Sequence, residues 1–377
     1  MATVRRRCPA DEPSGYLYLV DPQRGAVLQR SDIVEPLYRA LDRNPRGGMR
    51  GAKGISVRPD QIALANYSLI QRYDSEWNLL GAISHPSAAG IHDILFEGDH
   101  LWVAAAHLDL LARFSLDGTL ERGYYLRQPS PALRDLGWNP PVLLTPAEIF
   151  AGKLDFRHPL NVEKETYDRA HVNSVCRLPD GGLIVSLGFV FNDSYAHLLR
   201  LKNRLVRWGV WSFVKAGNQR LRQALGKRQK NVDPNLLVKP AKAQSALVRL
   251  AEDGRHTLTL KLAGVTAPSH SLLALPDGSL VYLNTSTGEA LHVDPQRGRV
   301  ISADLLDPQG FLRGVAPLDE RRLLIGSRRR LLVYDLPGRR VQDSFEISKD
   351  PEEAVYDIKE LPEHYAPPPA SFAGREA

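Results

Sequence analysis

The chain has 377 residues, 43% of them hydrophobic, and a formal net charge of +6, which indicates a folded protein with a sizeable core. No apolar run approaches the roughly 18 residues needed to span a bilayer, and no secretory signal follows the charged start Met1–Cys8. The two cysteines offer no disulfide framework. We therefore expect a cytoplasmic protein rather than a secreted or membrane-spanning one.

The first strand-like stretch, residues 15–28, is a hairpin around the turn Asp21–Gly25. The same five residue types return in the same order at Asp294–Gly298, within a later repeat. Strand-like runs on both sides of such a turn indicate a pair of outer strands. The stretch has no inner strand of its own, so we expect it to complete a sheet begun elsewhere in the chain.

Further along, six strand-like segments share one pattern. Each opens with a polar residue, has an aliphatic residue two positions later, and reaches an acidic turn residue seven positions after the opener. Because side chains alternate along an extended strand, the opener and its aliphatic residue lie on one face. The six openers are Lys53, His92, Asn173, His270, Arg313 and Tyr356.

The spacing of these openers predicts the architecture. Lys53 and His92 are 39 residues apart, and the steps from His270 to Arg313 and from Arg313 to Tyr356 are both 43, the length of a four-stranded propeller blade. The last segment is too short for a full blade, so the N-terminal hairpin must complete it. We therefore predict an all-β fold: a single six-bladed β-propeller domain over residues 1–377, closed by N-terminal strands that pair with the C-terminal blade.

The two longer intervals, 81 and 97 residues, each contain an insertion. Residues 127–169 are rich in proline and lack an Asp-Gly hairpin, so we predict an inserted loop that acts as a lid, and call it the lid segment. Residues 189–244 interrupt blade three and are called the basic insertion. Both leave the propeller at the end where the openers lie. The proline-containing tail, residues 366–377, is predicted to be loose.

Charge is concentrated in the basic insertion. Residues 202–242 contain 11 Lys or Arg and one acid, a net of +10, so the rest of the chain carries about −4 of the total of +6. Trp208, Trp211 and Phe213 are interleaved with these charges. The pattern is open to three interpretations: a partly helical solvated pair packed on the propeller, a surface that docks to a membrane or an acidic partner, or an element that captures substrate. Nucleic acid is an unlikely partner.

The openers form a polar ring at the channel mouth, with chemistry suited to a small anion. Lys53 and Arg313 supply positive charge, and Asn173 and Tyr356 can donate hydrogen bonds, so these four are the predicted substrate-binding residues. Asp93 and Asp357, each next to an opener, could make contacts between blades.

Histidines are the candidate catalytic residues. His92, His171 and His270 can act as general acids, bases or nucleophiles. The same three imidazoles could instead hold a divalent transition metal, although the nearby cations oppose one. The cofactor is therefore left open, and no metal ligand is assigned from the residues alone. Motifs of serine hydrolases, zinc proteases and nucleotide-binding proteins are missing from the sequence.

The repeat resembles the six-bladed propeller superfamily that includes gluconolactonase-like and strictosidine-synthase-like enzymes, the amidating lyase and the aryl sulfotransferases. His171-Val172-Asn173, His270, Arg313 and Lys53 are similar in kind to the channel residues with which aryl sulfotransferases hold a sulfuryl group. The amidating lyase holds zinc with three channel histidines, for which His92, His171 and His270 would be the counterparts. Some segments also resemble uncharacterised bacterial propellers.

Together these features predict an enzyme that binds a small anionic or carbonyl-containing substrate at the channel mouth. Its reaction would be a group transfer, a hydrolysis or an elimination. The alternative is a non-catalytic binding or scaffold propeller that docks to a membrane or an acidic partner through the basic insertion.

Overall fold

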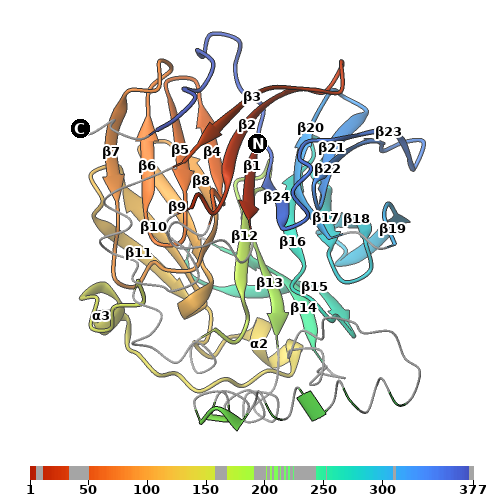
Figure 1. Cartoon of the computed structure of the whole chain (residues 1–377). Helices are drawn as coiled ribbons and strands as arrows, with labels where there is room; N and C mark the ends of the chain where they lie inside the picture. Colours follow the sequence, from red (N-terminus) through yellow and green to blue (C-terminus); the bar gives the residue numbers. More distant parts are fainter. Residues whose placement is uncertain are drawn as a thin grey trace.

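The computed structural model contains six four-stranded antiparallel sheets arranged around a central channel (Figure 1). It describes residues 1–5, 12–33, 51–157, 168–190, 243–251, 253–308 and 311–372, together with single positions and short runs between 201 and 224. The predicted six-bladed β-propeller is therefore confirmed. No helix among the described residues is long and apolar enough to cross a bilayer.

Each of the first three blades is a meander that runs from the channel outward. Blade one contains β4 (Ile55–Arg58), β5 (Gln61–Ala65), β6 (Ile70–Tyr73) and β7 (Leu79–Ile83). Blade two contains β8 (Ile91–Glu97), β9 (His100–Ala105), β10 (Leu110–Ser115) and β11 (Leu120–Tyr125), with the short helix η1 (Ala106–Leu108) between β9 and β10. Blade three contains β12 (Val172–Arg177), β13 (Leu183–Val190), β14 (Gln244–Leu250) and β15 (His256–Ala263).

The next two blades follow the same plan, and the last one closes the circle. Blade four contains β16 (His270–Ala274), β17 (Leu280–Asn284), β18 (Glu289–Asp294) and β19 (Arg299–Leu305). Blade five contains β20 (Leu312–Pro317), β21 (Arg322–Ser327), β22 (Arg330–Asp335) and β23 (Arg340–Glu346). Blade six combines β24 (Glu353–Asp357) with β1 (Ala2–Arg5), β2 (Tyr16–Asp21) and β3 (Ala26–Asp32).

Blade six is completed by three N-terminal strands, one more than the hairpin that the sequence predicted. β1 pairs antiparallel with the inner strand β24, and β2 and β3 form the predicted hairpin outside it. Inside this sheet Thr3 Oγ1 donates to a Glu353 carboxylate oxygen at 2.6 Å, and both residues are buried. The pairing joins the two ends of the chain and closes the circle of blades.

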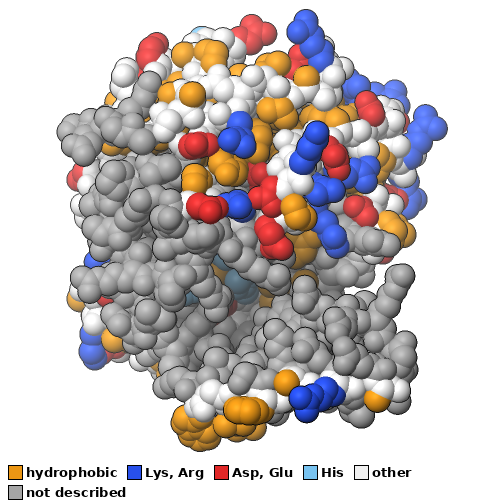
Figure 2. All heavy atoms as spheres, viewed as in Figure 1, with side chains coloured by type: hydrophobic (Ala, Val, Ile, Leu, Met, Phe, Trp, Pro, Cys, Tyr) orange, Lys and Arg blue, Asp and Glu red, His pale blue; other side chains and the backbone are white. Residues whose placement is uncertain are grey.

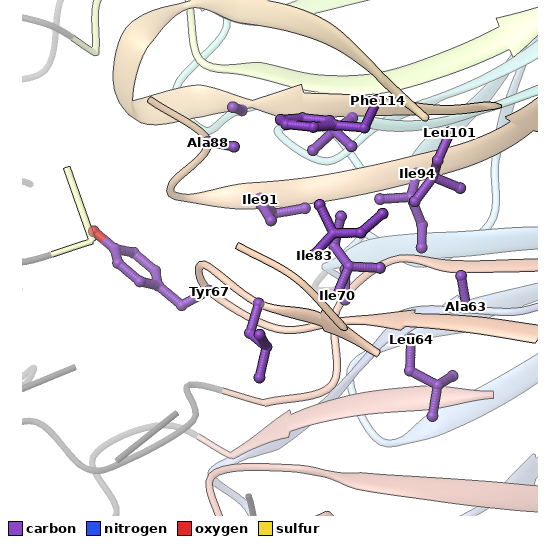
Figure 3. Packing of buried hydrophobic residues seen from close by; sticks show 14 of the residues in the cluster. Ala63, Leu64, Tyr67, Ile70, Ile83, Ala88, Ile91, Ile94, Leu101 and Phe114 are labelled. Atoms are coloured by element: carbon purple, nitrogen blue, oxygen red, sulfur yellow. The ribbon is translucent and has the colours of Figure 1, made fainter. Parts of the chain in front are cut away.

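The aliphatic residues of the six repeats are all buried, as the alternation predicted. They are Ile55, Ile94, Val175, Leu272, Val315 and Ile358. Figure 3 shows Ile70 and Ile83 of blade one beside Ile91 and Ile94 of β8, within one apolar cluster that joins the two blades. Such packing between neighbouring sheets fixes the position of each inner strand and therefore of each opener.

Adjacent inner strands are also joined by hydrogen bonds from the residue that follows each opener. At four junctions the side chain of this residue accepts a hydrogen bond from a backbone N–H of the next blade, at donor–acceptor distances of 2.8–3.0 Å. Asp93 accepts from Val175, Ser174 from Ser271, Ser271 from Gly314, and Asp357 from Ile55. The blade-to-blade contacts expected of Asp93 and Asp357 are thus confirmed.

The other two junctions have glycine at this position, where the blades approach too closely for a side chain. A Cβ atom on Gly54 would lie 2.9 Å from Asp93 Cα, and one on Gly314 would lie 2.9 Å from Ile358 Cγ1. Gly314 also has a positive φ of 75°, which disfavours any other residue.

The tail is ordered further than predicted. Phe372 is buried against Tyr73 and Trp77, and its backbone N–H donates to Asp32 O at 3.1 Å. Residues 366–372, within the segment predicted to be loose, are thus held by aromatic contacts to blade one and by a backbone hydrogen bond to Asp32 of blade six. Residues 373–377 lie outside the described part of the chain.

The lid segment contains two short helices rather than a plain loop. Helix α2 (Pro131–Leu136) packs its apolar side on blade three, and Lys261 Nζ of β15 donates to Leu136 O at 3.4 Å. Helix α3 (Pro146–Phe150) lies near β11, and Ser87 Oγ donates to Ile149 O at 2.7 Å. The described parts of this segment thus pack on blades two and three, and residues 158–167 lie outside the description.

Candidate functional site

The six openers converge on the channel from six different blades, as their register predicted. Lys53 lies just before β4, and the other five belong to β8, β12, β16, β20 and β24. Tyr356 lies at the centre of the group: its ring is 5.8 Å from Lys53 Nζ, 4.7 Å from Arg313 Cζ and 5.7 Å from the His92 ring. Figure 2 shows histidine surface in a hollow near the middle of the view.

The Asn173 amide makes a hydrogen bond within the protein. Its side-chain N–H donates to Ser269 O at 2.6 Å, so part of the amide connects blade three to blade four. Its carbonyl oxygen is buried and has no hydrogen-bond partner among the described residues. That oxygen is an acceptor, so it is suited to a hydrogen-bond donor of a ligand.

Three histidines form a compact cluster, which we call the histidine cluster. The ring centroids of His92 and His171 are 4.5 Å apart, and the centroid of His270 lies 5.6 Å from that of His92 and 6.0 Å from that of His171. One ligand atom from each ring lies within 4.8 Å of the others. The cluster combines two openers with His171, the residue just before β12.

Each ring has a contact on its Nδ1 atom. Asp168 carboxylate oxygens lie 3.1 Å from Nδ1 of His171, the Tyr356 hydroxyl contacts Nδ1 of His92, and Thr285 Oγ1 is 3.5 Å from Nδ1 of His270. Within the described part of the chain no hydrogen bond engages the Nε2 atom of any of the three. For His270 this nitrogen is also fully buried. Among these contacts, Nδ1 of each ring is therefore the nitrogen that the protein engages.

Burial and nearby cations keep two of these histidines neutral. The pKa of His92 is well below its usual value because the ring is buried and because Lys53 and Arg313 are close. The pKa of His270 is also well below its usual value, mainly because the ring is buried and in addition because Arg313 is close. At neutral pH both rings are therefore bases or ligands rather than acids. The general-acid role that the sequence left open for them does not fit the resting site.

His171 is held by a network that sequence reasoning missed. Its backbone has a positive φ of 53°, which is uncommon for a residue other than glycine. The Asp109 carboxylate accepts from the backbone N–H groups of Arg169, Ala170 and His171 at 2.9–3.0 Å. The same carboxylate accepts from Arg127 Nε at 3.0 Å, and both side chains are completely buried.

This network explains how the lid segment enters blade three. Asp109 lies at the end of η1 in blade two, about 60 residues before the backbone groups that it binds. Its only sequence signal is an acidic residue inside the apolar run Leu108–Leu111. Burial raises the pKa of Asp109, and Arg127 opposes that effect.

Further along the channel from the ring lies a group of charges. Lys359 Nζ donates to an Asp357 carboxylate oxygen at 2.9 Å, and Asp93 lies in the same small cavity beside His92 and His270. Burial raises the pKa of Asp93 to about 7, although Lys359 opposes it. The volume open to the centre of a water molecule in this cavity is about 10 Å³. That is close to the space that one water molecule needs.

Two cations border the histidine cluster. Arg313 lies over the rings of Phe311 and Tyr356, with Cζ at 4.4 and 4.7 Å from their centroids, and Lys53 Nζ is 5.4 Å from the Tyr67 ring. Stacking holds a guanidinium in place while its N–H groups remain directed at other partners. The site thus combines neutral imidazoles with fixed positive charge.

Comparisons with known proteins identify the fold class. No protein-family model and no curated protein matches the chain. A chain of the nidogen/laminin complex is similar with a TM-score of 0.52 at 10% identity, covering 95% of this chain and 98% of that one. A protein of unknown function from Bacteroides caccae gives 0.50 at 8% identity, covering 95% and 97%. A streptogramin B lyase gives 0.43 at 8%, covering 79% and 70%.

At these identities a structural likeness shows the fold alone. The chain is a six-bladed β-propeller, and its function has to be argued from the residues at the channel mouth.

Proposed function

We propose that this protein is an enzyme that binds a small anionic or carbonyl-containing substrate at the channel mouth, and that the histidine cluster holds a divalent transition metal there. The observation that carries the proposal is the convergence of three histidines from three blades, with each Nδ1 in contact and each Nε2 available. Metal-binding histidines characteristically use one ring nitrogen as ligand while the other contacts a carboxylate or hydroxyl.

The positive charges of Lys53 and Arg313 have two opposite effects on metal binding. Repulsion from Lys53 and Arg313 weakens the binding of a cation, but the same charges keep His92 and His270 in the neutral form that binds metals. A bound divalent ion would supply a Lewis acid that polarises a carbonyl or other substrate oxygen. Calcium does not fit, because this donor set consists of nitrogens rather than oxygens.

The chain's own residues would bind and orient the substrate. Arg313 is suited to hold a carboxylate or a similar group through paired N–H donors, and Lys53 adds a second positive charge. If Nε2 of His92 is the ligand atom, then Nδ1 carries the proton and donates to the Tyr356 oxygen. The hydroxyl proton of Tyr356 is then free to donate to a substrate oxygen. Burial raises the pKa of Tyr356, which keeps that proton in place.

The test is turnover of a panel of small lactones, esters and carboxylate-bearing substrates by the full chain. The protein is stripped with a chelator and then refilled with Zn²⁺ or Co²⁺. We expect turnover to disappear on stripping and to return on refilling, and Arg313→Lys to raise KM more than it lowers kcat. Turnover that survives both chelation and His270→Ala would contradict the proposal. Metal and anion binding with no turnover across the panel would favour the non-catalytic alternative.

A further inference from the structure

The basic insertion exposes large apolar side chains to solvent. Phe213 is 77% exposed and Trp208 is 69% exposed, the two highest values for large hydrophobic residues in the described part of the chain. Leu201 and Val210 are also exposed, at 52% and 41%. A cluster of exposed aromatic and aliphatic residues on one surface element marks an interaction site more often than a chance arrangement.

Positive charge lies beside these side chains. Arg204 and Arg220 are exposed in the same element, and Figure 2 shows apolar and basic side chains along the lower edge of the molecule. In Figure 1 the same element lies below the blades. Its sequence carries a net charge of +10 over residues 202–242, whereas the rest of the chain is about −4. The attraction for anions is therefore local to this element.

The element also has helical geometry. Described positions 201, 204, 205, 210, 213, 216, 217, 220 and 224 are helical. Trp208 N donates to Arg204 O at 2.9 Å, the spacing of a helical turn. Leu201 and Arg204 are helical, and Trp208 lies in the turn that follows, just before Gly209 with its positive φ of 71°. Their spacings of three and four residues place the three side chains on the same side of this segment. Cationic and apolar groups thus meet on one surface.

We propose that the described part of the basic insertion docks the propeller onto an anionic lipid bilayer. The side chains that carry the proposal are Leu201, Arg204, Trp208, Val210, Phe213 and Arg220. In an interfacial helix, Trp and Phe enter the boundary between headgroups and acyl chains while Lys and Arg bind anionic headgroups. A nucleic acid would stack its bases on aromatic rings but offers no apolar medium for the exposed aliphatic side chains of Leu201 and Val210. A polyacidic peptide matches the charge but has little apolar surface to cover them. The bilayer accounts for both the charge and the exposed apolar side chains.

This surface is connected to the end of the propeller that holds the histidine cluster. The basic insertion leaves blade three after Val190 and returns at Gln244, and these two residues pair across β13 and β14. In the same sheet Val172, next to His171, pairs with Leu187. A bilayer bound through the insertion would therefore lie on the mouth side of the propeller. The inference does not depend on the proposed chemistry.

Co-sedimentation of the full chain with vesicles tests the proposal. We expect binding to phosphatidylcholine vesicles that contain phosphatidylserine, weaker binding to phosphatidylcholine alone, and a decrease as salt is raised. Trp208→Ser combined with Phe213→Ser should lower the partition coefficient roughly tenfold or more. Arg204→Ser combined with Arg220→Ser should lower it by roughly tenfold as well.

Matched controls come from exposed residues on the blades. Leu28 and Leu305 are 55% and 60% exposed on the outer strands β3 and β19, so changing both to Ser removes exposed apolar side chains from a different surface. Arg24 and Arg299 are exposed arginines for the charge control. Both control pairs should bind vesicles like the wild type.

Three results would overturn the proposal. The first is equal binding to the two kinds of vesicle that neither variant pair changes. The second is no vesicle binding together with tight binding of poly-glutamate or duplex DNA, which would assign the surface to an acidic macromolecule. The third is a dimer in analytical ultracentrifugation that Trp208→Ser with Phe213→Ser dissociates, which would assign it to a second copy of the chain.

Discussion

Both carboxylate oxygens of Asp168 lie 3.1 Å from Nδ1 of His171, three residues later in the loop that enters blade three. Asp168 is buried, so its charge acts on the ring with little screening by water. A carboxylate in this position orients the imidazole and makes its other nitrogen a better ligand. Asp168 is therefore a positioning residue for the histidine cluster.

Removing this carboxylate should weaken metal binding without removing a ligand. We expect Asp168→Ala to lower the affinity for Zn²⁺ by roughly 10- to 100-fold, measured by competition with a chelating dye. Asp155, which binds Arg157 in the same segment, supplies the control Asp155→Ala with unchanged affinity. Equal affinities for Asp168→Ala and the wild type would show that the carboxylate has only a structural role.

The Asp109 network should be one of the most sensitive points of the fold. Asp109→Asn removes the charge that pairs with the buried Arg127 guanidinium at 3.0 Å, so we expect the free energy of unfolding to fall by about 3 kcal/mol. Urea denaturation followed by fluorescence measures the change. Asp117→Asn, at an exposed hairpin, should leave the same quantity close to the wild-type value, because Asn keeps the side-chain oxygen that accepts from Thr119 N. Similar small effects in both variants would mean that the network does not stabilise the entry into blade three.

The sequence was sufficient to predict the blades but not these networks. A repeated polar opener, aliphatic residue and acidic turn is a local pattern, so the period reported the number of blades and the residues that share the channel. Asp109 and His171 are 62 positions apart and belong to different blades, so no local pattern connects them. β1 was missed because the arginines that follow Val4 resemble a charged terminus rather than a strand.

A glycine between blades five and six tests the tight junction there. Gly314→Ala combines a positive φ with a Cβ atom 2.9 Å from Ile358 Cγ1. Gly181→Ala is the matched control, because Gly181 also has a positive φ but has nothing within 4 Å of the added atom. We expect the control to cost about 1 kcal/mol of stability and Gly314→Ala about 2 kcal/mol more. Equal costs would indicate that the blades can separate without penalty.

The neutral histidines predict how stability depends on pH in the metal-free protein. Their pKa values are lowered in the folded state from 6.5, so the unfolded chain binds more protons once the pH falls below that value. Each of His92 and His270 should therefore reduce the free energy of unfolding by up to about 1.4 kcal/mol per pH unit below pH 6.5. Above pH 6.5 both rings are neutral in the folded and in the unfolded state, so they no longer change the free energy of unfolding with pH.

This dependence is measured as a difference between variants. Asp93, with a pKa raised to about 7, has the opposite effect below that pH, because the folded state then binds the extra proton. Comparing His270→Gln with the wild type largely cancels that contribution. We expect the wild type to lose more stability than His270→Gln between about pH 7 and pH 5, whereas His364→Gln, at an exposed position, should follow the wild type. A slope unchanged by His270→Gln would contradict the neutral state of this ring.

The most direct test of the account is the amount of metal held by the purified full chain. After removal of metal and dialysis against Zn²⁺ or Co²⁺, elemental analysis should find one ion per chain in the wild type and in His364→Ala. The same measurement should find little metal in His92→Ala, His171→Ala and His270→Ala when all three remain folded by circular dichroism. A wild-type chain that retains no transition metal, or single variants that retain as much as the wild type, would contradict the proposed three-histidine site.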